Sequence, residues 1–219
     1  MKQKLLLISL ILLIPVLTVF AQNKPSEKKA RRILKELSLK YKKYKTIEAH
    51  FSFTLNNPQD HINEVQSGVL YVDPAGNKYH LQLNGQELFS DGKLTYTYLK
   101  AQKEMQLANV DTNTDAINPA KIFSMYETGY DASYSKEVQQ GKSKLDVIDL
   151  IPQHSKKIVK AQISVLKRQR QIYQVRLFDK SGNQYIYTVN QFIPNPALSP
   201  DIFVFNKKNY PGVEVIDLR

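Results

Sequence analysis

The sequence predicts a mainly β fold with two helices (α+β), in which both helices lie against the apolar face of one large, strongly curved antiparallel sheet. Three observations predict it. Apolar residues recur at every second position in many short segments, which is typical of half-buried strands. Turn residues such as Asn84-Gly85 and Asp91-Gly92 separate these segments. Two further stretches, one before the strands and one between them, have helical spacing instead.

Five of the predicted strands lie close together in residues 66–110, and they should form an antiparallel meander with one continuous apolar face. A strand at residues 47–55 leads into this meander, and residues 130–138 are either a strand or a loop. Further strands are predicted at residues 144–150, 159–165, 173–177 and 185–189, so that the chain has roughly ten strands.

The first predicted helix follows Ser26, a residue able to cap a helix. Its apolar residues form one stripe on an otherwise charged surface: Ala30, Ile33, Leu34, Leu37 and Tyr41. The second helix is predicted to begin at Asn118-Pro119, a capping residue followed by a proline suited to the first helical position, and to end before Gly129.

The first 21 residues have the pattern of a cleavable secretory signal. Lys2 and Lys4 precede an apolar run from residue 5 to residue 17, and Val19 and Ala21 stand at the positions that signal peptidase reads. We therefore expect cleavage after Ala21 and a single domain over residues 22–219. The 219-residue sequence contains no cysteine, so neither a disulfide nor a lipid-attachment cysteine is available, and we expect a soluble exported protein.

The chain is basic, with a formal net charge of +11 at pH 7. Such a charge suggests nucleic acid as a partner, but an exported protein rarely meets it and the charge is spread over several short runs. We expect no nucleic-acid binding. The runs are Lys28–Arg32, Lys40–Lys45, Lys156–Lys160 and Lys167–Arg170. Each is either a solvated surface or a region attracted to an anionic membrane or an acidic partner.

The sequence lacks recognisable catalytic and metal-binding motifs. Its four histidines, His50, His61, His80 and His154, have no metal-ligand spacing, and His80 alternates with apolar neighbours as a solvent-facing strand residue does. A Gly-x-Ser-x-Gly nucleophile motif and a phosphate-binding glycine loop are both missing. We therefore expect no catalytic residue, no metal and no cofactor.

Aromatic residues are abundant by contrast, with thirteen tyrosines and nine phenylalanines. An ordinary hydrophobic core is one explanation. The sheet, however, has more apolar positions than two short amphipathic helices easily cover, and a curved sheet leaves room for a ligand on its concave side. Because few charged side chains point to that face, an aliphatic ligand is the natural expectation.

The chain resembles the LolA-type periplasmic lipoprotein carriers over nearly its whole mature length. The matching segments are Lys42–Ile47 with Ala49–Phe51, Gly68–Tyr71, Ser90–Lys93 with Tyr96 and Tyr98, Asn118-Pro119, Leu150–Pro152, and the tail Phe203–Phe205 with Pro211–Asp217. Their order and spacing carry the resemblance. One departure is Asp73, which stands where better-known members have an arginine that links sheet to lid; Lys78 is the nearest substitute.

The resemblance implies an unclosed antiparallel β half-barrel whose apolar concave face lies under a helical lid. Such a carrier takes the acyl chains of lipoproteins from an inner-membrane ABC exporter, shields them across the periplasm, and yields them at the outer membrane or to an acceptor there. It uses no cofactor, and we expect a monomer.

On this hypothesis one set of residues lines the cavity and another forms the lid. The cavity residues are Phe51, Phe53, Leu55, Val69, Tyr71, Tyr79, Leu81, Leu83, Tyr96, Tyr98, Met105 and Leu107. The lid residues are Ile33, Leu34, Leu37, Ile122, Phe123 and Tyr126. The alternative is a periplasmic sensor of lipid or lipoprotein that regulates a membrane partner. A lipid hydrolase is a third possibility, but it needs a nucleophile and base that the sequence does not show.

Overall fold

The computed structural model describes residues 25–110, 119–155 and 157–219. The predicted signal peptide, Asn118 and Lys156 lie outside the described residues. The elements along the chain are α1 (Pro25–Tyr41), β1 (Ile47–Asn57), β2 (Ile62–Asp73), β3 (Lys78–Leu83), β4 (Gln86–Ser90), β5 (Leu94–Leu99), β6 (Glu104–Asn109), the 3-10 turns η1 (Pro119–Lys121) and η2 (Met125–Glu127), β7 (Tyr130–Gln140), β8 (Ser143–Pro152), β9 (Ile158–Leu166), β10 (Gln171–Asp179), β11 (Gln184–Pro194), the 3-10 turns η3 (Pro200–Phe203) and η4 (Lys207–Asn209), and β12 (Glu214–Asp217).

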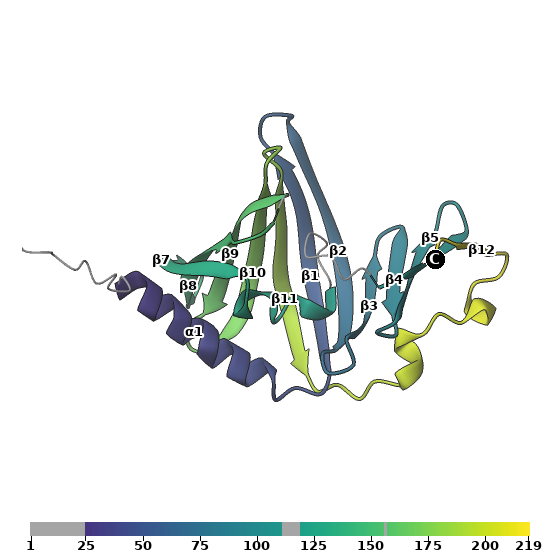
Figure 1. The fold of residues 1–219 in the computed structure, drawn as a ribbon, viewed down its shortest axis with the longest axis horizontal. Coiled ribbons are helices and arrows are strands. Elements are labelled where there is room, and N and C mark those ends of the chain that lie inside the picture. Colours follow the sequence, from purple (N-terminus) through teal and green to yellow (C-terminus); the bar gives the residue numbers. More distant parts are fainter. Residues whose placement is uncertain (1–24, 111–118, 156) are drawn as a thin grey trace, which may run out of the picture.

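The strands of the described residues form a single 12-stranded sheet in the order β12-β6-β5-β4-β3-β2-β1-β11-β10-β9-β8-β7. Neighbouring strands are antiparallel, except for β12, which runs parallel to β6. Figure 1 shows this sheet curving from β7, beside α1, through β1 and β2 in the middle to β12 at the far end. The two outermost strands do not pair with each other, so the sheet is unclosed.

The predicted strands are confirmed throughout, and the ambiguous stretch at residues 130–138 is strand β7. The prediction of two helices is wrong. Where a second α-helix was expected, the described residues contain only the short turns η1 and η2, and Thr128 is already extended. A helix of about ten residues is marginal without tertiary support. In this stretch Phe123 and Tyr126 are buried although the backbone forms only 3-10 turns, so their burial does not require a continuous helix.

Helix α1 covers the β7–β10 part of the inner face of the sheet. Its predicted apolar stripe is buried, with Ala30, Ile33 and Leu37 at most 1% exposed. These residues belong to one hydrophobic cluster with Ile148, Ile163 and other strand residues. The backbone amide of Ile172, at a register shift in β10, donates a hydrogen bond to the Tyr41 hydroxyl at 3.1 Å. The helix is therefore firmly fixed on the sheet.

The C-terminal segment packs against the opposite face of the sheet. Phe205, Tyr210 and Val213 form a second cluster with Phe89 and Met105 of strands β4 and β6. Strand β12 then extends the sheet beyond β6. Both faces of this end of the sheet therefore bury apolar side chains, although the sequence analysis assumed only one apolar face.

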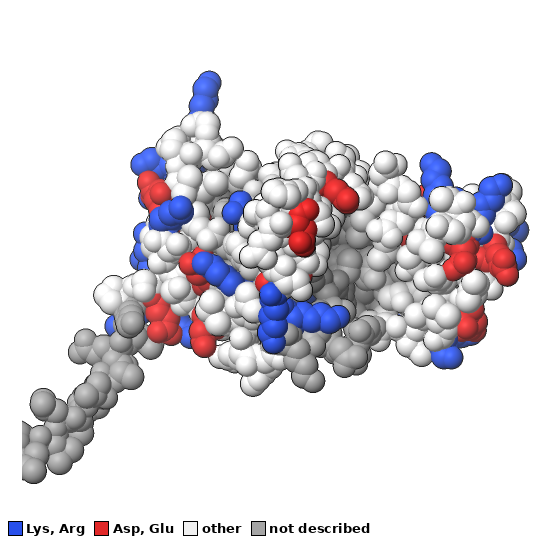
Figure 2. Space-filling model, turned by 90° about the horizontal axis from the view of Figure 1, so that it is seen from above, with Lys and Arg blue, Asp and Glu red and all other residues white. Residues whose placement is uncertain are grey.

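Many lysine and arginine side chains of the described residues are exposed. Figure 2 shows them interspersed with aspartate and glutamate on the face that it displays. Several form ion pairs, among them Lys144 and Lys167 with Glu137 and Lys160 with Asp149.

Candidate functional site

A cavity of about 390 Å³ lies on the inner face of the sheet. That volume is within the range of roughly 300–1,000 Å³ that is usual for small-molecule sites. Residues from β1, β2, β3 and β4 line it on one side, residues from β10 and β11 on the other, and the segment around η1 covers it. The lining residues are Ala49, Phe51, Phe53, Leu70, Tyr79, Leu81, Leu83, Gln86, Leu88, Pro119, Ile122, Phe123, Ile172, Val175, Tyr185, Tyr187 and Val189.

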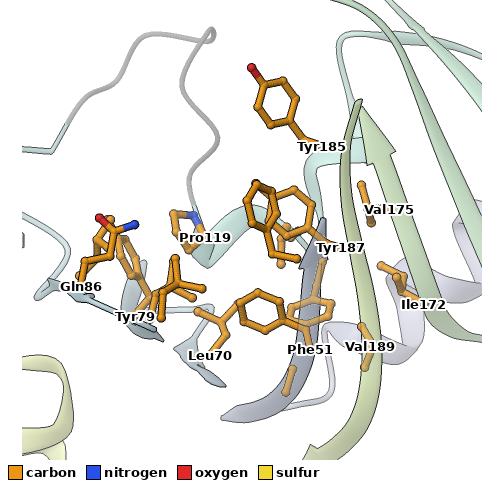
Figure 3. Close-up of a pocket in the computed structure, with 17 residues that line it drawn as sticks. Phe51, Leu70, Tyr79, Gln86, Pro119, Ile172, Val175, Tyr185, Tyr187 and Val189 are labelled. Carbon is orange, nitrogen blue, oxygen red and sulfur yellow. The ribbon is translucent and has the colours of Figure 1, made fainter. Parts of the chain in front are cut away.

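Strand pairing explains why these side chains share one face. Leu81 of β3 is paired with Leu70 of β2 and with Leu88 of β4, and directly paired residues point to the same side of a sheet. In Figure 3, Tyr79 and Gln86 lie toward one end of the cavity and Ile172, Val175 and Val189 toward the other, with Pro119 between them. The cavity thus spans several neighbouring strands.

Gly68 makes room for one of the cavity's aromatic rings. A Cβ atom at this position would lie 2.6 Å from Cζ of Phe51 and 2.8 Å from the carbonyl oxygen of Gln82. Both distances are too short for a side chain to fit without movement. Glycine at this point of β2 therefore lets the Phe51 ring lie close against the strand, where it forms part of the cavity wall.

Among the described residues, the lining of the cavity is apolar and includes no charged side chain. Its polar groups are the Gln86 amide and the hydroxyls of Tyr79, Tyr185 and Tyr187. The Tyr185 hydroxyl donates a hydrogen bond to Asp179 at 3.0 Å, and Figure 3 shows it pointing away from the other labelled side chains. Burial and the neighbouring Tyr185 raise the pKa of Tyr187 to about 12. A lining of this chemistry suits a hydrocarbon chain.

The raised pKa of Tyr187 predicts a loss of stability in alkaline solution. An unfolded tyrosine ionises at its ordinary pKa of 10.0, whereas folded Tyr187 keeps its proton up to about 12. The contribution of protonated Tyr187 to the free energy of unfolding is therefore fully present below about pH 10. It is lost as the pH rises toward 12, by up to about 3 kcal/mol. We expect Tyr187→Phe to flatten this part of the profile when unfolding free energy is measured against pH. An equally steep decline in the variant would contradict the prediction.

The segment from residue 119 to residue 129, which we call the cover segment, closes one side of the cavity. Pro119, Ile122 and Phe123 line the cavity from this segment. The Phe123 ring stacks on Tyr41 of α1 at a centroid distance of 5.1 Å and meets Phe192 edge-on at 5.7 Å. Tyr126 is buried at 4% exposure. The cover segment is thus attached to the core through aromatic contacts.

A polar junction joins the far end of the cover segment to α1. The Ser38 hydroxyl donates a hydrogen bond to one carboxylate oxygen of Glu127, and the Lys42 ammonium group lies 3.0 Å from the other. Ser38 is buried on α1, whereas the Lys42 side chain is 63% exposed. Partial burial acts to raise the pKa of Glu127, but these two partners outweigh it and hold the pKa below its usual value.

Some of the predicted cavity residues line this cavity and others do not. Phe51, Phe53, Tyr79, Leu81 and Leu83 line it, as do the predicted lid residues Ile122 and Phe123. Leu55 lies farther along β1, half-buried and outside the lining, and the lid residues Ile33, Leu34, Leu37 and Tyr126 lie in the main hydrophobic cluster. The remaining six predicted cavity residues face the opposite side of the sheet: Val69, Tyr71, Tyr96, Tyr98, Met105 and Leu107.

Alternation along a strand defines two faces but does not say which one is inside. On β2 the odd-numbered Val69 and Tyr71 were assigned to the cavity, but Leu70 lies there because its neighbours are Ala49 and Leu81. His80 was expected to face solvent, yet it is 6% exposed. Its Nε2 atom lies 3.0 Å from the Glu87 carboxylate, and its ring stacks on Phe89 at 4.1 Å. It is buried on the face that carries the C-terminal cluster.

The sequence analysis missed the wall that β10 and β11 provide. Ile172, Val175, Tyr185, Tyr187 and Val189 line the cavity, although these segments were recognised only as strands. Their role depends on the pairing of β11 with β1, which joins residues 128 to 147 positions apart. The alternation in residues 185–189 marked an apolar face, but it gave no sign of which strand lies beside it.

Asp73, the position at which the sequence analysis noted a departure, closes a turn. Its carboxylate accepts a hydrogen bond from the Gly76 amide at 3.0 Å.

Two further properties bear on the function of the molecule. Among the described residues no group of three or more histidine, aspartate or glutamate side chains is placed to hold a metal ion. The helices in this part of the chain are too short or too polar to cross a membrane.

A comparison of the sequence with models of protein families shows which family the chain belongs to. The family model described as outer membrane lipoprotein carrier protein LolA matches residues 42–206, which is well over half of the chain. The chain belongs to the LolA family. The match begins just after α1 and ends just before η4, so it contains the whole cavity lining and the cover segment.

Several solved structures are similar to this chain. An uncharacterised conserved protein from Thermus thermophilus superposes with a TM-score of 0.59 at 12% identity, covering 86% of this chain and 99% of that one. A putative outer membrane lipoprotein-sorting protein domain from Vibrio parahaemolyticus gives 0.47 at 13% identity, with 84% and 98% coverage. A LolA superfamily protein from Nitrosomonas europaea gives 0.44 at 11% identity, with 80% and 97% coverage. No curated protein sequence matches the chain.

Proposed function

We propose that this protein carries the acyl chains of lipoproteins through the periplasm, from the inner membrane to the outer membrane. The observation that supports this most strongly is the apolar, uncharged cavity of about 390 Å³ on the inner face of a LolA-family sheet. Residues 1–21 act as the export signal in this proposal, and residues 22–219 act as one soluble lipid-binding domain that is not itself lipidated.

The energetics of a carrier demand both strong shielding and ready release. Each methylene group that leaves water contributes about 0.8 kcal/mol, so a long acyl chain left in water costs on the order of 10 kcal/mol. The uncharged lining offsets most of this cost. Release needs a part that moves without unfolding the sheet, and the cover segment of short 3-10 turns meets this need.

The partners in this proposal are the lipoprotein acyl chains, an inner-membrane ABC lipoprotein exporter, and the outer membrane or an acceptor in it. The protein acts as a monomer, binds no nucleic acid, and uses no metal, cofactor or catalytic residue. Its work is therefore binding and release, and no covalent bond of the cargo changes.

The direct experiment is to purify the mature protein from periplasm under mild conditions and record native mass spectra, followed by lipid extraction. We expect a bound lipoprotein or diacyl or triacyl lipid, and an empty fraction that takes up added lipoprotein from detergent. A protein that is empty and also refuses added lipoprotein would contradict the proposal. Recovery of a membrane regulator in a stable complex, without lipid transfer, would favour the sensor instead.

A further inference from the structure

The cover segment and helix α1 differ in how firmly they are held. Leu37 of α1 is fully buried, and Tyr41 bonds to the backbone of β10. The cover segment is anchored by buried Phe123 and Tyr126, but it has only short 3-10 turns, and Lys121, Ser124 and the residues from Glu127 to Gly129 are exposed. If the cavity opens, the cover segment is therefore the part that moves, with α1 as its fixed support.

The polar junction described above connects these two parts at the surface. The two carboxylate oxygens of Glu127 bind different partners: one accepts a hydrogen bond from Ser38 on α1, and the other pairs with Lys42, which directly follows α1. Only three residues separate it along the chain from Phe123, which lines the cavity. Glu127, Ser38 and Lys42 do not line the cavity themselves. Breaking the junction should therefore change how often the cover segment opens, while the contacts available to a ligand stay the same.

We propose that Glu127 is a positioning residue whose bonds to Ser38 and Lys42 hold the cover segment closed and set the rate at which the cavity opens. The junction lies outside the cavity lining, so on this proposal it forms in the empty and the filled protein alike, and its loss should speed entry and exit of the ligand by similar factors. The dissociation constant, which is the ratio of the two rates, should then change little. The nature of the ligand rests on the proposed function, whereas the junction rests on the contacts just given.

The first test measures opening of the empty protein. Because the sequence has no cysteine, Ala49→Cys gives a single thiol on the cavity wall, at a position only 2% exposed. Its rate of labelling by a bulky maleimide dye reports exposure of the cavity. Adding Glu127→Gln removes the charge and nearly preserves the shape, and we expect about tenfold faster labelling.

Two further variants show whether the effect belongs to the junction. Glu27→Gln breaks the ion pair with Arg31, also on α1, at 2.9 Å and away from the cover segment, and it should label at the parent rate. The exchanged pair Lys42→Glu with Glu127→Lys should return the rate toward that of the parent. Equal labelling of the parent and Glu127→Gln, in proteins of unchanged circular dichroism, would overturn the proposal.

The second test uses a fluorescent long-chain fatty acid in stopped flow, with the cysteine-free protein. We expect Glu127→Gln to raise the association and dissociation rates together, about tenfold, with the dissociation constant unchanged within about twofold. An increase in the dissociation rate with an unchanged association rate would overturn the proposal, because the weaker binding would make Glu127 a ligand contact. If the parent binds no fatty acid, the proposed function fails, and the labelling experiment still decides the role of the junction.

Discussion

The substitution Leu81→Glu is expected to abolish acyl-chain binding and leave the sheet folded. Leu81 lies in the cavity wall between Leu70 and Leu88. In the empty protein a carboxylate at this half-buried site still reaches water. An acyl chain in the cavity would strip that water away, at a cost of several kcal/mol for an unpaired charge. Affinity should therefore fall by about 100-fold or more, measured by titration with a fluorescent fatty acid.

The matched control for this experiment is Val65→Glu. Val65 is on β2 of the same sheet but is 64% exposed and outside the cavity lining. The substitution Val65→Glu introduces the same charge as Leu81→Glu, and acyl-chain binding should stay at the wild-type level. Circular dichroism and the thermal midpoint show whether each variant is folded. Full binding by a folded Leu81→Glu protein would mean that the ligand does not occupy this cavity.

The substitution Met105→Ala is expected to have the opposite profile, with a large loss of stability and no loss of binding. Met105 was predicted to line the cavity, yet its side chain is fully buried in the second cluster, on the other face of the sheet. Truncating a fully buried methionine usually costs about 2–5 kcal/mol, because it loses apolar contacts and leaves a cavity. We expect a loss of this size in denaturant unfolding and fatty-acid affinity unchanged within about twofold.

The conservative variant Met105→Leu separates packing from any special role of the residue. A volume-conserving exchange in a core usually costs less than about 1.5 kcal/mol, so this protein should remain close to the wild type. If Met105→Ala instead abolished binding while its unfolding free energy stayed unchanged, the ligand would lie beneath the C-terminal segment, and the assignment of the two faces would be reversed.

Local patterns predicted the strands well because each depends on its own residues. The alternation of Tyr79, Leu81 and Leu83 needs no partner to be recognised, and the turns at Asn84-Gly85 and Asp91-Gly92 mark where such segments end. The stripe on α1 is equally local. The element order also predicted one strongly curved sheet, and the resemblance to the LolA family added the expectation that this sheet is an unclosed half-barrel.

The choice of face needed information from outside each strand. Tyr96, Tyr98 and Met105 form a convincing apolar face, but Phe205 and Tyr210 of the C-terminal segment cover it. Nothing near residues 94–107 shows that a segment about 100 residues later packs there. The same holds for Tyr185 and Tyr187, whose place in the cavity wall depends on the pairing of β11 with β1.

The cover segment shows a different limit of the sequence analysis. A proline and three well-spaced apolar residues predicted a helix, and those side chains are indeed buried or half-buried, but the backbone forms only 3-10 turns. Spacing in so short a stretch predicts which side chains face inward better than it predicts the backbone. The bonds of Glu127 to Ser38 and Lys42 were not predictable either, since they join residues more than 80 positions apart.

The central claim, that an acyl chain occupies the inner-face cavity, is tested most directly with a photoreactive fatty acid. The probe carries a diazirine along its chain, and the residues it labels are mapped by mass spectrometry after proteolysis. We predict labels on Phe51, Leu81 and Tyr187, reduced by competing lipoprotein. Labels confined to Tyr98, Met105 and Tyr210, on the opposite face, would contradict the account.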